Sequence, residues 1–144
     1  MKIELIKNSK IASVDFNNLP FGSVYSDHMF ECDFKDGAWQ NPTIKPYSPI
    51  VLDPSAKIFH YGQSIFEGMK AFKGPHNETF LFRPEENAKR LNKSATRLCM
   101  PEIPEELFLE GLNALLKLDE KSEERISSQA SMDRSVVISS KDYT

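Results

Sequence analysis

The chain has 144 residues and a mass of 16.4 kDa, the size of one ordinary domain, and 40% of its residues are hydrophobic. Its formal net charge of −3 gives it no overall cationic field, which argues against binding to nucleic acids or to an anionic membrane. The two cysteines, Cys32 and Cys99, are too few for a disulfide scaffold, and no Cys/His spacing predicts a metal site. The N-terminus lacks the apolar core of a signal peptide, and no window is apolar enough to span a membrane, so we expect a cytoplasmic protein.

The first elements predicted are an N-terminal arm over residues 1–20 and a β-hairpin after it. From His28 onward, apolar residues alternate with charged ones as far as the turn signal Asp36-Gly37, which is typical of a strand that enters a hairpin. The apolar face of this strand consists of Phe30, Cys32 and Phe34.

Proline dominates the next segment, where four of the nine prolines fall between Trp39 and Pro54. Because proline cannot donate to a strand ladder, we expect only short strands, one at Ile44 to Lys45 and another near Ile50 to Leu52. A loop or short turn is predicted after Lys57, since glycines interrupt the aromatic residues that follow.

A second hairpin and two helices are predicted next. Two short apolar strands, Met69 to Phe72 and Thr79 to Phe82, flank a stretch rich in turn residues. Each helix then opens with a proline and two glutamates, at Pro84 and at Pro104, where a missing N–H and negative charge are both favourable. Apolar residues recur at helical spacing: Ala88, Leu91, Ala95 and Leu98 in the first helix, and Leu107, Phe108, Gly111, Leu112, Leu115 and Leu118 in the second.

The stretch 121–144 differs from the rest because it is rich in serine and charge. It supports one short strand at most, and we expect it to be a disordered tail. We expect residues 21–120 to form the domain, with an α+β fold: a mostly antiparallel sheet with two helices packed on one face.

Four features could carry chemistry. On the first helix, Arg90 lies nearest the apolar face, where its guanidinium could hold a phosphate, although a solvated basic face is the commoner outcome. Glu67 could act as an acid or base, or simply pair with a cation. Asp27 and His28 could orient an imidazole, but no nucleophile motif accompanies them, so a structural hydrogen bond is favoured. Cys99 ends a helix among apolar neighbours, where a buried inert thiol is expected.

Aromatic residues next to glycines mark a further candidate. Tyr61 and Phe66 stand beside Gly62 and Gly68, a combination that suits a small-molecule pocket or, equally, an ordinary core at a glycine-rich corner.

Five segments, taken together, resemble the N-terminal domain of branched-chain amino acid aminotransferases, pyridoxal-phosphate enzymes of fold type IV. They are FGSVYSDHMF at 21–30, IKPY at 44–47, HYGQSIFEGMKAF at 60–72, LFRPEENAKRLNKSATRL at 81–98 and LLKLDE at 115–120. An alternative is another enzyme of the same fold, a D-amino acid aminotransferase or an aminodeoxychorismate lyase; such enzymes do not share the first two segments, which argues against it.

The resemblance implies roles for individual residues. Arg90 matches the arginine that holds the phosphate of pyridoxal 5'-phosphate, Tyr61 lines the site, and Phe66, with Phe21, matches the wall around a branched side chain. Gly68 would allow the backbone to approach closely. The implied reaction moves the amino group of Leu, Ile or Val to 2-oxoglutarate, with amino acids and 2-oxo acids as partners and a homodimer as the assembly.

The resemblance also implies what this sequence lacks. The family's Schiff-base lysine lies in a second, C-terminal domain, and Lys70 matches no Schiff-base position, so no catalytic residue is assigned here. The Tyr-x-Arg-Pro strand that the family has after its second helix is missing. We therefore expect a truncated or frame-shifted product, inactive by itself; the alternative is a non-catalytic remnant or a fragment that associates with full-length subunits.

Overall fold

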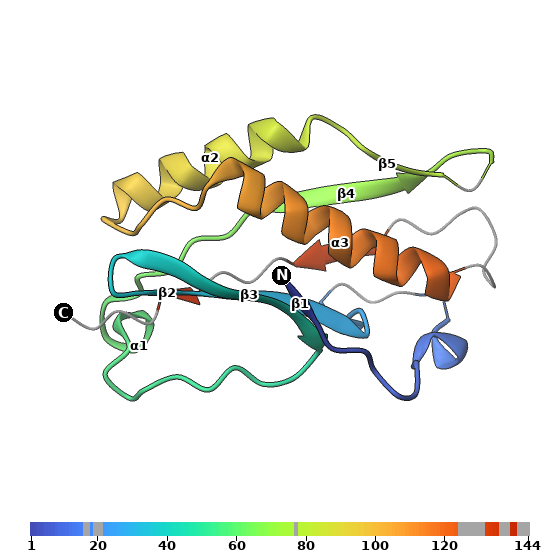
Figure 1. The fold of residues 1–144 in the computed structure, drawn as a ribbon, viewed down its shortest axis with the longest axis horizontal. Coiled ribbons are helices and arrows are strands. Elements are labelled where there is room, and N and C mark those ends of the chain that lie inside the picture. The colour runs from blue at the N-terminus through green and yellow to red at the C-terminus, as the bar shows by residue number, and fades with distance from the viewer. Residues whose placement is uncertain (16–17, 19–21, 77, 124–131, 136–138, 141–144) are drawn as a thin grey trace.

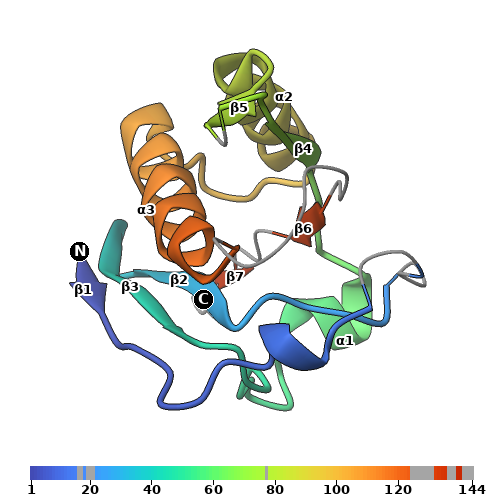
Figure 2. The same ribbon diagram turned by 90° about the vertical axis from the view of Figure 1, so that its right-hand side faces the viewer.

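The computed structural model describes residues 1–15, 18, 22–76, 78–123, 132–135 and 139–140. Helix α3 (Glu105–Glu123) lies between a larger sheet on one side and helix α2 (Pro84–Arg97) with a smaller sheet on the other (Figures 1 and 2). The other elements, in chain order, are β1 (Lys2–Ile3), a 3-10 turn η1 (Ile11–Ser13), β2 (His28–Lys35), β3 (Ala38–Pro46), α1 (Lys57–Tyr61), β4 (Gly68–Lys73), β5 (Thr79–Leu81), β6 (Met132–Ser135) and β7 (Ser139–Ser140). This α+β arrangement confirms the fold class.

The larger sheet is built on the predicted first hairpin. Strands β2 and β3 pair antiparallel, and β1 and β7 add parallel edges in the order β1-β3-β2-β7. Asp36 and Gly37 join the hairpin with φ angles of 53° and 76°, and two such residues make the turn whose twist suits a two-residue hairpin. The hairpin predicted at Asp36-Gly37 is therefore confirmed.

Strand β3 is longer than the predicted strand at Ile44 to Lys45. The pairing with β2 shifts register where Glu31 and Asp33 face Thr43 and Gln40, so β3 holds one extra residue there. Asn41 (φ 53°) and Pro42 lie in this bulge, and a bulge leaves a residue outside the ladder, so the missing N–H of proline costs no hydrogen bond.

One other local prediction is wrong, and a second is right only in part. No strand forms near Ile50 to Leu52, because prolines on either side remove donors and Val51 is 86% exposed, with nothing to pack against. The segment after Lys57 begins with the short helix α1, and residues 62–67 then form a loop that leads into β4, so the predicted loop or short turn is confirmed only for its second part. Gly62 caps α1 with a φ of 60°, which glycine adopts readily because it has no Cβ.

The smaller sheet has the order β5-β4-β6, and both of its pairings are antiparallel. The predicted hairpin of β4 and β5 is confirmed. Strands β6 and β7 come from the stretch 121–144, for which the sequence supported one strand at most. The other residues of 124–144 lie outside the described residues, so the disordered tail there stays a prediction.

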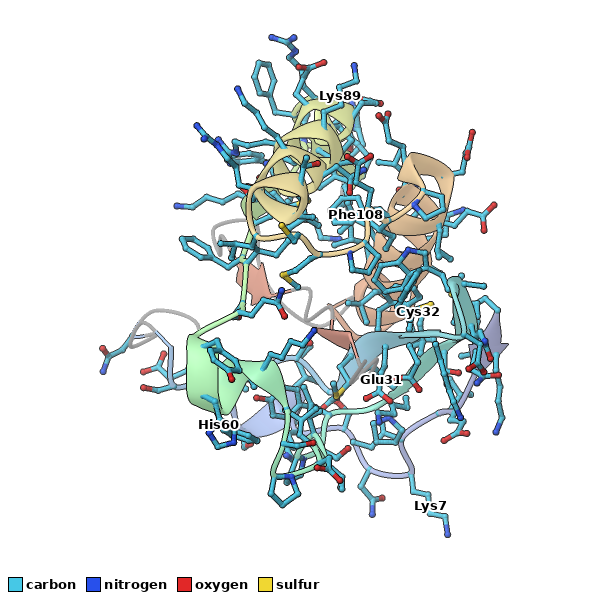
Figure 3. All side chains as sticks on the ribbon, turned by 90° about the vertical axis from the view of Figure 1, so that its left-hand side faces the viewer. Lys7, Glu31, Cys32, His60, Lys89 and Phe108 are labelled. Atoms are coloured by element: carbon cyan, nitrogen blue, oxygen red, sulfur yellow. The ribbon has the colours of Figure 1, made fainter. Side chains whose placement is uncertain are left out.

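Helix α3 has two buried faces, which accounts for its stripe of apolar residues. One face packs on α2 and the smaller sheet, and the other packs on β2 and β3, so one helix joins both halves of the domain (Figure 3). The first cluster is formed by Ala88, Leu91, Ile103, Phe108, Leu112 and Leu116, and the second by Phe30, Cys32, Ile44 and Leu115. Among the described residues, no helix is both long and apolar enough to cross a bilayer.

The end of α2 differs from the prediction. Leu98, expected on the apolar face, is 40% exposed, and Cys99, expected to be buried, is exposed. The helix closes with hydrogen bonds from Cys99 N to Thr96 O and from Met100 N to Ala95 O, and Cys99 has a left-handed φ of 53°. This is a Schellman closure, which turns the chain out of the helix before Cys99 can reach the core.

Candidate functional site

Arg90 projects from α2 and forms a two-point ion pair with Glu67, the residue just before β4. Its Nε donates to Glu67 Oε2 at 2.7 Å, and its Nη2 donates to Glu67 Oε1. The carboxylate side chain is only 5% exposed, whereas the arginine side chain is 67% exposed. The arginine is therefore held from the protein side and open on the solvent side.

Two further donors hold the same carboxylate. The backbone N of Gly68 donates to Glu67 Oε1 at 2.8 Å, and Asn87 Nδ2 donates to it at 3.2 Å. Asn87 Nδ2 also donates to Gly68 O at 3.1 Å. Because Asn87 and Arg90 are three residues apart, they lie on one face of α2, and together they fasten the start of β4 to that helix.

The electrostatics of the pair follow from these contacts. The hydrogen bond from Arg90 lowers the pKa of the Glu67 carboxyl from its usual 4.5; burial opposes this, and the bonds from Asn87 and Gly68 lower the pKa further. The same pair raises the pKa of Arg90. Both groups are thus charged at neutral pH.

The geometry leaves part of the guanidinium available to a ligand. A guanidinium has five N–H donors, and Glu67 takes one from Nε and one from Nη2. The edge formed by Nη1 and Nη2 matches a phosphate or carboxylate, which accept two parallel hydrogen bonds. At the neighbouring Gly68, an added Cβ would meet no atom within 4 Å, so the backbone there is open to an approaching molecule.

Comparison with known proteins identifies the relatives of this chain. It is 47% identical over 120 residues to branched-chain-amino-acid aminotransferase 2 of Bacillus subtilis, covering 83% of this chain and 33% of that protein. It is 51% identical over 105 residues to a branched-chain-amino-acid aminotransferase of Mycolicibacterium smegmatis, covering 72% and 28%. The chain is homologous to about one third of a branched-chain-amino-acid aminotransferase. No family model matches.

The aminotransferase relatives support the resemblance seen in the sequence, and the structure brings two of its five site residues together. Arg90 and Gly68 are joined through Glu67 and Asn87.

Tyr61 and Phe66 are 81% and 89% exposed, on α1 and in the link to β4. Phe21 lies outside the described residues. The assignment of these three aromatic residues to an aminotransferase substrate pocket therefore stays a prediction.

The partners of Arg90 were only partly foreseen. The sequence left open that Glu67 pairs with a cation, but nothing indicated which one, because Glu67 and Arg90 are 23 positions apart. Asn87 was missed, although its spacing of three residues from Arg90 on a predicted helix is a signal for a shared face.

Asp27 and His28 have the structural role that the sequence favoured. His28 Nε2 accepts from Ile6 N at 3.0 Å, while Asp27 accepts from Ser9 Oγ at 2.5 Å and from Lys10 N at 3.1 Å. These bonds fasten the N-terminal arm to the start of β2.

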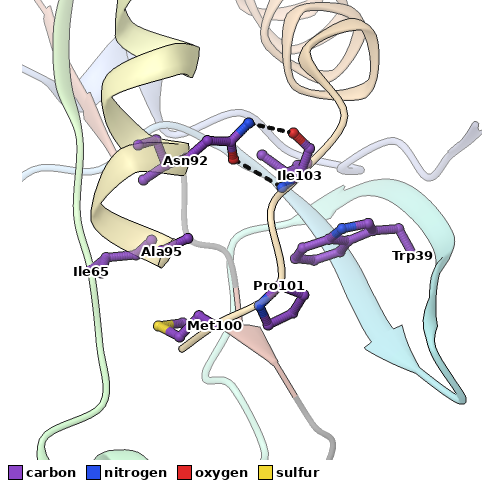
Figure 4. A pocket seen from close by; sticks show the side chains of 8 residues that line it. Trp39, Ile65, Asn92, Ala95, Met100, Pro101 and Ile103 are labelled. Atoms are coloured by element: carbon purple, nitrogen blue, oxygen red, sulfur yellow. Dashed lines mark hydrogen bonds between the residues drawn. The ribbon is translucent and has the colours of Figure 1, made fainter. Parts of the chain in front are cut away.

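A small cavity of about 10 Å³ lies apart from Arg90, between the end of α2 and the β2–β3 hairpin (Figure 4). The polar groups of its lining side chains are already bonded, Asn92 to the backbone of Ile103 and Trp39 Nε1 to Glu102 O. The cavity is thus a packing gap. No group of three or more potential metal ligands occurs in the part of the chain that the structure describes.

Proposed function

We propose that this chain supplies the phosphate-holding part of a pyridoxal-phosphate-dependent branched-chain amino acid aminotransferase, with one wall of its substrate pocket. A single observation carries the proposal: the guanidinium of Arg90 is bound along its Nε/Nη2 edge by Glu67, which leaves the Nη1/Nη2 edge for a ligand. The curated relatives, which are named as branched-chain aminotransferases, support it.

The residues present fit pyridoxal 5'-phosphate. Its phosphate, a dianion, would accept parallel hydrogen bonds from the free guanidinium edge, and the open space at Gly68 would leave room for a group beside the backbone. When bound, the cofactor supplies the electron sink for amino-group transfer. In our proposal Arg90 binds and orients the phosphate, while the rings of Tyr61, Phe66 and Phe21 exclude water around a branched side chain.

The chain spans about a third of the length of the curated relatives that it matches. We propose that it does not catalyse transamination alone, because the family resemblance assigns the Schiff-base lysine to another part of the relatives. The same resemblance gives amino acids and 2-oxo acids as substrates, a homodimer as the assembly and the cytoplasm as the compartment.

A chimera tests the proposed role directly. The 120 residues of the Bacillus subtilis aminotransferase 2 that match this chain are replaced by the corresponding residues of this chain. We expect the chimera to bind the cofactor and to transfer the amino group of leucine to 2-oxoglutarate. Arg90→Ala in the chimera is expected to weaken cofactor affinity by roughly 10-fold to 100-fold, the effect of losing hydrogen bonds to a charged group.

Arg97→Ala is the matched control, since Arg97 is an exposed arginine on the same helix, about two turns beyond Arg90. Equal losses for the two substitutions would contradict the role of Arg90. Inactivity of the isolated chain is tested separately, by adding pyridoxal phosphate, reducing with borohydride and measuring intact mass. A single reduced adduct on one lysine would show that the chain has a nucleophile of its own.

A second candidate function is association with another subunit without catalysis. Phe72 and Phe80 face each other across β4 and β5 and are 51% and 53% exposed, and Phe82 is 78% exposed. Exposed aromatic groups of this kind favour contact with another protein. Sedimentation of the chain over a range of concentrations tests this: a monomer at every concentration would exclude self-association.

A further inference from the structure

Glu67 poses an electrostatic question about the site. A carboxylate beside an arginine partly cancels the positive charge that attracts a phosphate, so a site optimised only for attraction would not contain one. Glu67 nevertheless contacts two nitrogens of Arg90 and is 5% exposed. Glu67 must therefore contribute to phosphate binding by Arg90 in some way other than through its charge.

Orientation is what the contacts supply. The arginine side chain is 67% exposed, and a long exposed side chain samples many rotamers. Two bonds to one carboxylate fix both the position and the rotation of the planar guanidinium. The free edge, made of Nη1 and Nη2, then has one defined direction.

The carboxylate is itself fixed. Glu67 Oε1 accepts from the backbone N of the next residue, Gly68, at 2.8 Å and from Asn87 Nδ2 at 3.2 Å. Asn87 also holds Gly68 O at 3.1 Å, so β4 and α2 are aligned by the same side chain. A displacement of β4 relative to α2 would be passed to Arg90 through Glu67.

We propose that Glu67 is the positioning residue for Arg90: it occupies the Nε edge of the guanidinium, so that a phosphate can bind only at the Nη1/Nη2 edge. Asn87 assists by holding the carboxylate. This inference rests on the proposed function of Arg90 as the phosphate-binding residue.

The test follows the side-chain N–H signals of Arg90 by NMR in the full ¹⁵N-labelled chain while inorganic phosphate is added. In the wild-type chain we expect the Nη signals to shift and the Nε–H signal to stay in place. In Glu67→Gln, solvent exchange of the Nε–H should accelerate by at least about tenfold, because a charge-assisted bond is lost. Phosphate should then shift the Nε–H signal as well.

Glu86→Gln is the matched control. Glu86 is a glutamate on α2, the helix that carries Arg90, and it pairs with Lys89 at 3.0 Å. Its substitution therefore removes one carboxylate charge near Arg90 without removing a contact of Arg90. It should leave the Nε–H exchange and the pattern of shifts as in the wild type. Asn87→Ala keeps the charge of Glu67 but removes one of its donors, and it should give an exchange rate between those of the wild type and Glu67→Gln.

The outcomes separate the two proposals. If phosphate shifts no signal of Arg90 in the wild type, Arg90 does not bind phosphate here and the proposed function loses its support. If the Nη signals shift but the Nε–H signal shifts with them in the wild type, Glu67 does not reserve that edge and the positioning role is wrong. The role is equally wrong if Glu67→Gln behaves as Glu86→Gln does. The wild-type titration alone can thus overturn it, even if a variant fails to fold.

Discussion

The side chain of Asn92 pairs with the backbone of Ile103 as a strand residue would. Asn92 Nδ2 donates to Ile103 O at 2.8 Å, and Asn92 Oδ1 accepts from Ile103 N at 2.9 Å (Figure 4). Ile103 is only 3% exposed, so water cannot easily replace either bond. This pairing fixes the segment that leads from α2 into α3.

Asn92→Asp tests the importance of this pairing. Aspartate can still accept from Ile103 N, but its carboxylate cannot donate and would face the carbonyl oxygen. We expect the free energy of unfolding to fall by about 1–3 kcal/mol, the usual cost of a buried group left without its partner. Urea unfolding measures the change. Asn113→Asp, at an exposed position of α3, is the control and should change stability by less than about 1 kcal/mol. Equal effects at the two positions would contradict the prediction.

Gly111 allows α3 to pack closely on β2. A Cβ at Gly111 would lie 2.8 Å from Phe30 Cζ, and Phe30 is 2% exposed, so its ring has little freedom to move. Alanine normally stabilises a helix by about 1 kcal/mol relative to glycine. We nevertheless expect Gly111→Ala to reduce the free energy of unfolding by about 1–2 kcal/mol, because overpacking a core costs more than this gain.

Urea unfolding measures the effect of Gly111→Ala, and it can also test whether the ring of Phe30 is what limits residue 111. Phe30→Leu should be destabilising alone, but combined with Gly111→Ala it should cost less than the sum of the two. Simple additivity would mean that the ring of Phe30 does not limit residue 111.

Cys99 occupies the position after α2 where glycine is the commonest residue. Its φ of 53° brings the Cβ of an L-residue close to the following carbonyl. Cys99→Gly should therefore raise the free energy of unfolding by up to about 1 kcal/mol, the Cβ strain being partly offset by the greater freedom of glycine in the unfolded chain. Cys99→Ala keeps the Cβ and should give no gain. Similar melting temperatures for the two variants would contradict the strain argument.

The parts of the fold that were predictable depend on neighbouring residues. Asp36-Gly37 and the alternation before it define the first hairpin, and Pro84 followed by two glutamates defines the start of α2. The predictions from sequence were wrong where a distant contact, or an unusual residue at a turn, determines the backbone conformation. Pro42 stays in a strand because β2 imposes the pairing around a bulge. Cys99 is outside the core because α2 ends in a Schellman closure that forms without glycine, the residue that usually marks one in a sequence.

The candidate site likewise has a part that the sequence predicted and a part that only the tertiary structure shows. Arg90 could be singled out from its position next to the apolar face, and the family resemblance gave it a role. Its contact with Glu67 depends on packing between α2 and the start of β4, which no local pattern encodes. The fixed direction of the guanidinium is thus a property of the tertiary structure, although each residue that creates it is visible in the sequence.

The pairing of Glu67 with Arg90 predicts a specific dependence of stability on pH. The pKa of Glu67 is lowered in the folded chain from its usual 4.5, mainly by the hydrogen bond from Arg90. The unfolded chain therefore takes up a proton first as the pH falls, and it binds more protons than the folded chain in this range. The stabilisation is complete above about pH 4.5 and is lost progressively as the pH falls through the lowered pKa.

Urea unfolding between pH 7 and pH 3 checks this. As the pH is lowered, the free energy of unfolding should fall less steeply in Glu67→Gln than in the wild type, because the variant has no carboxylate to protonate at position 67. Glu86→Gln provides the contrast: the pKa of Glu86 is also lowered, first by the hydrogen bond from Lys89, but its side chain is 52% exposed. Solvent and salt screen such a pair, so its removal should leave the slope nearly unchanged. A wild-type slope in Glu67→Gln would mean that the pair with Arg90 does not stabilise the folded chain.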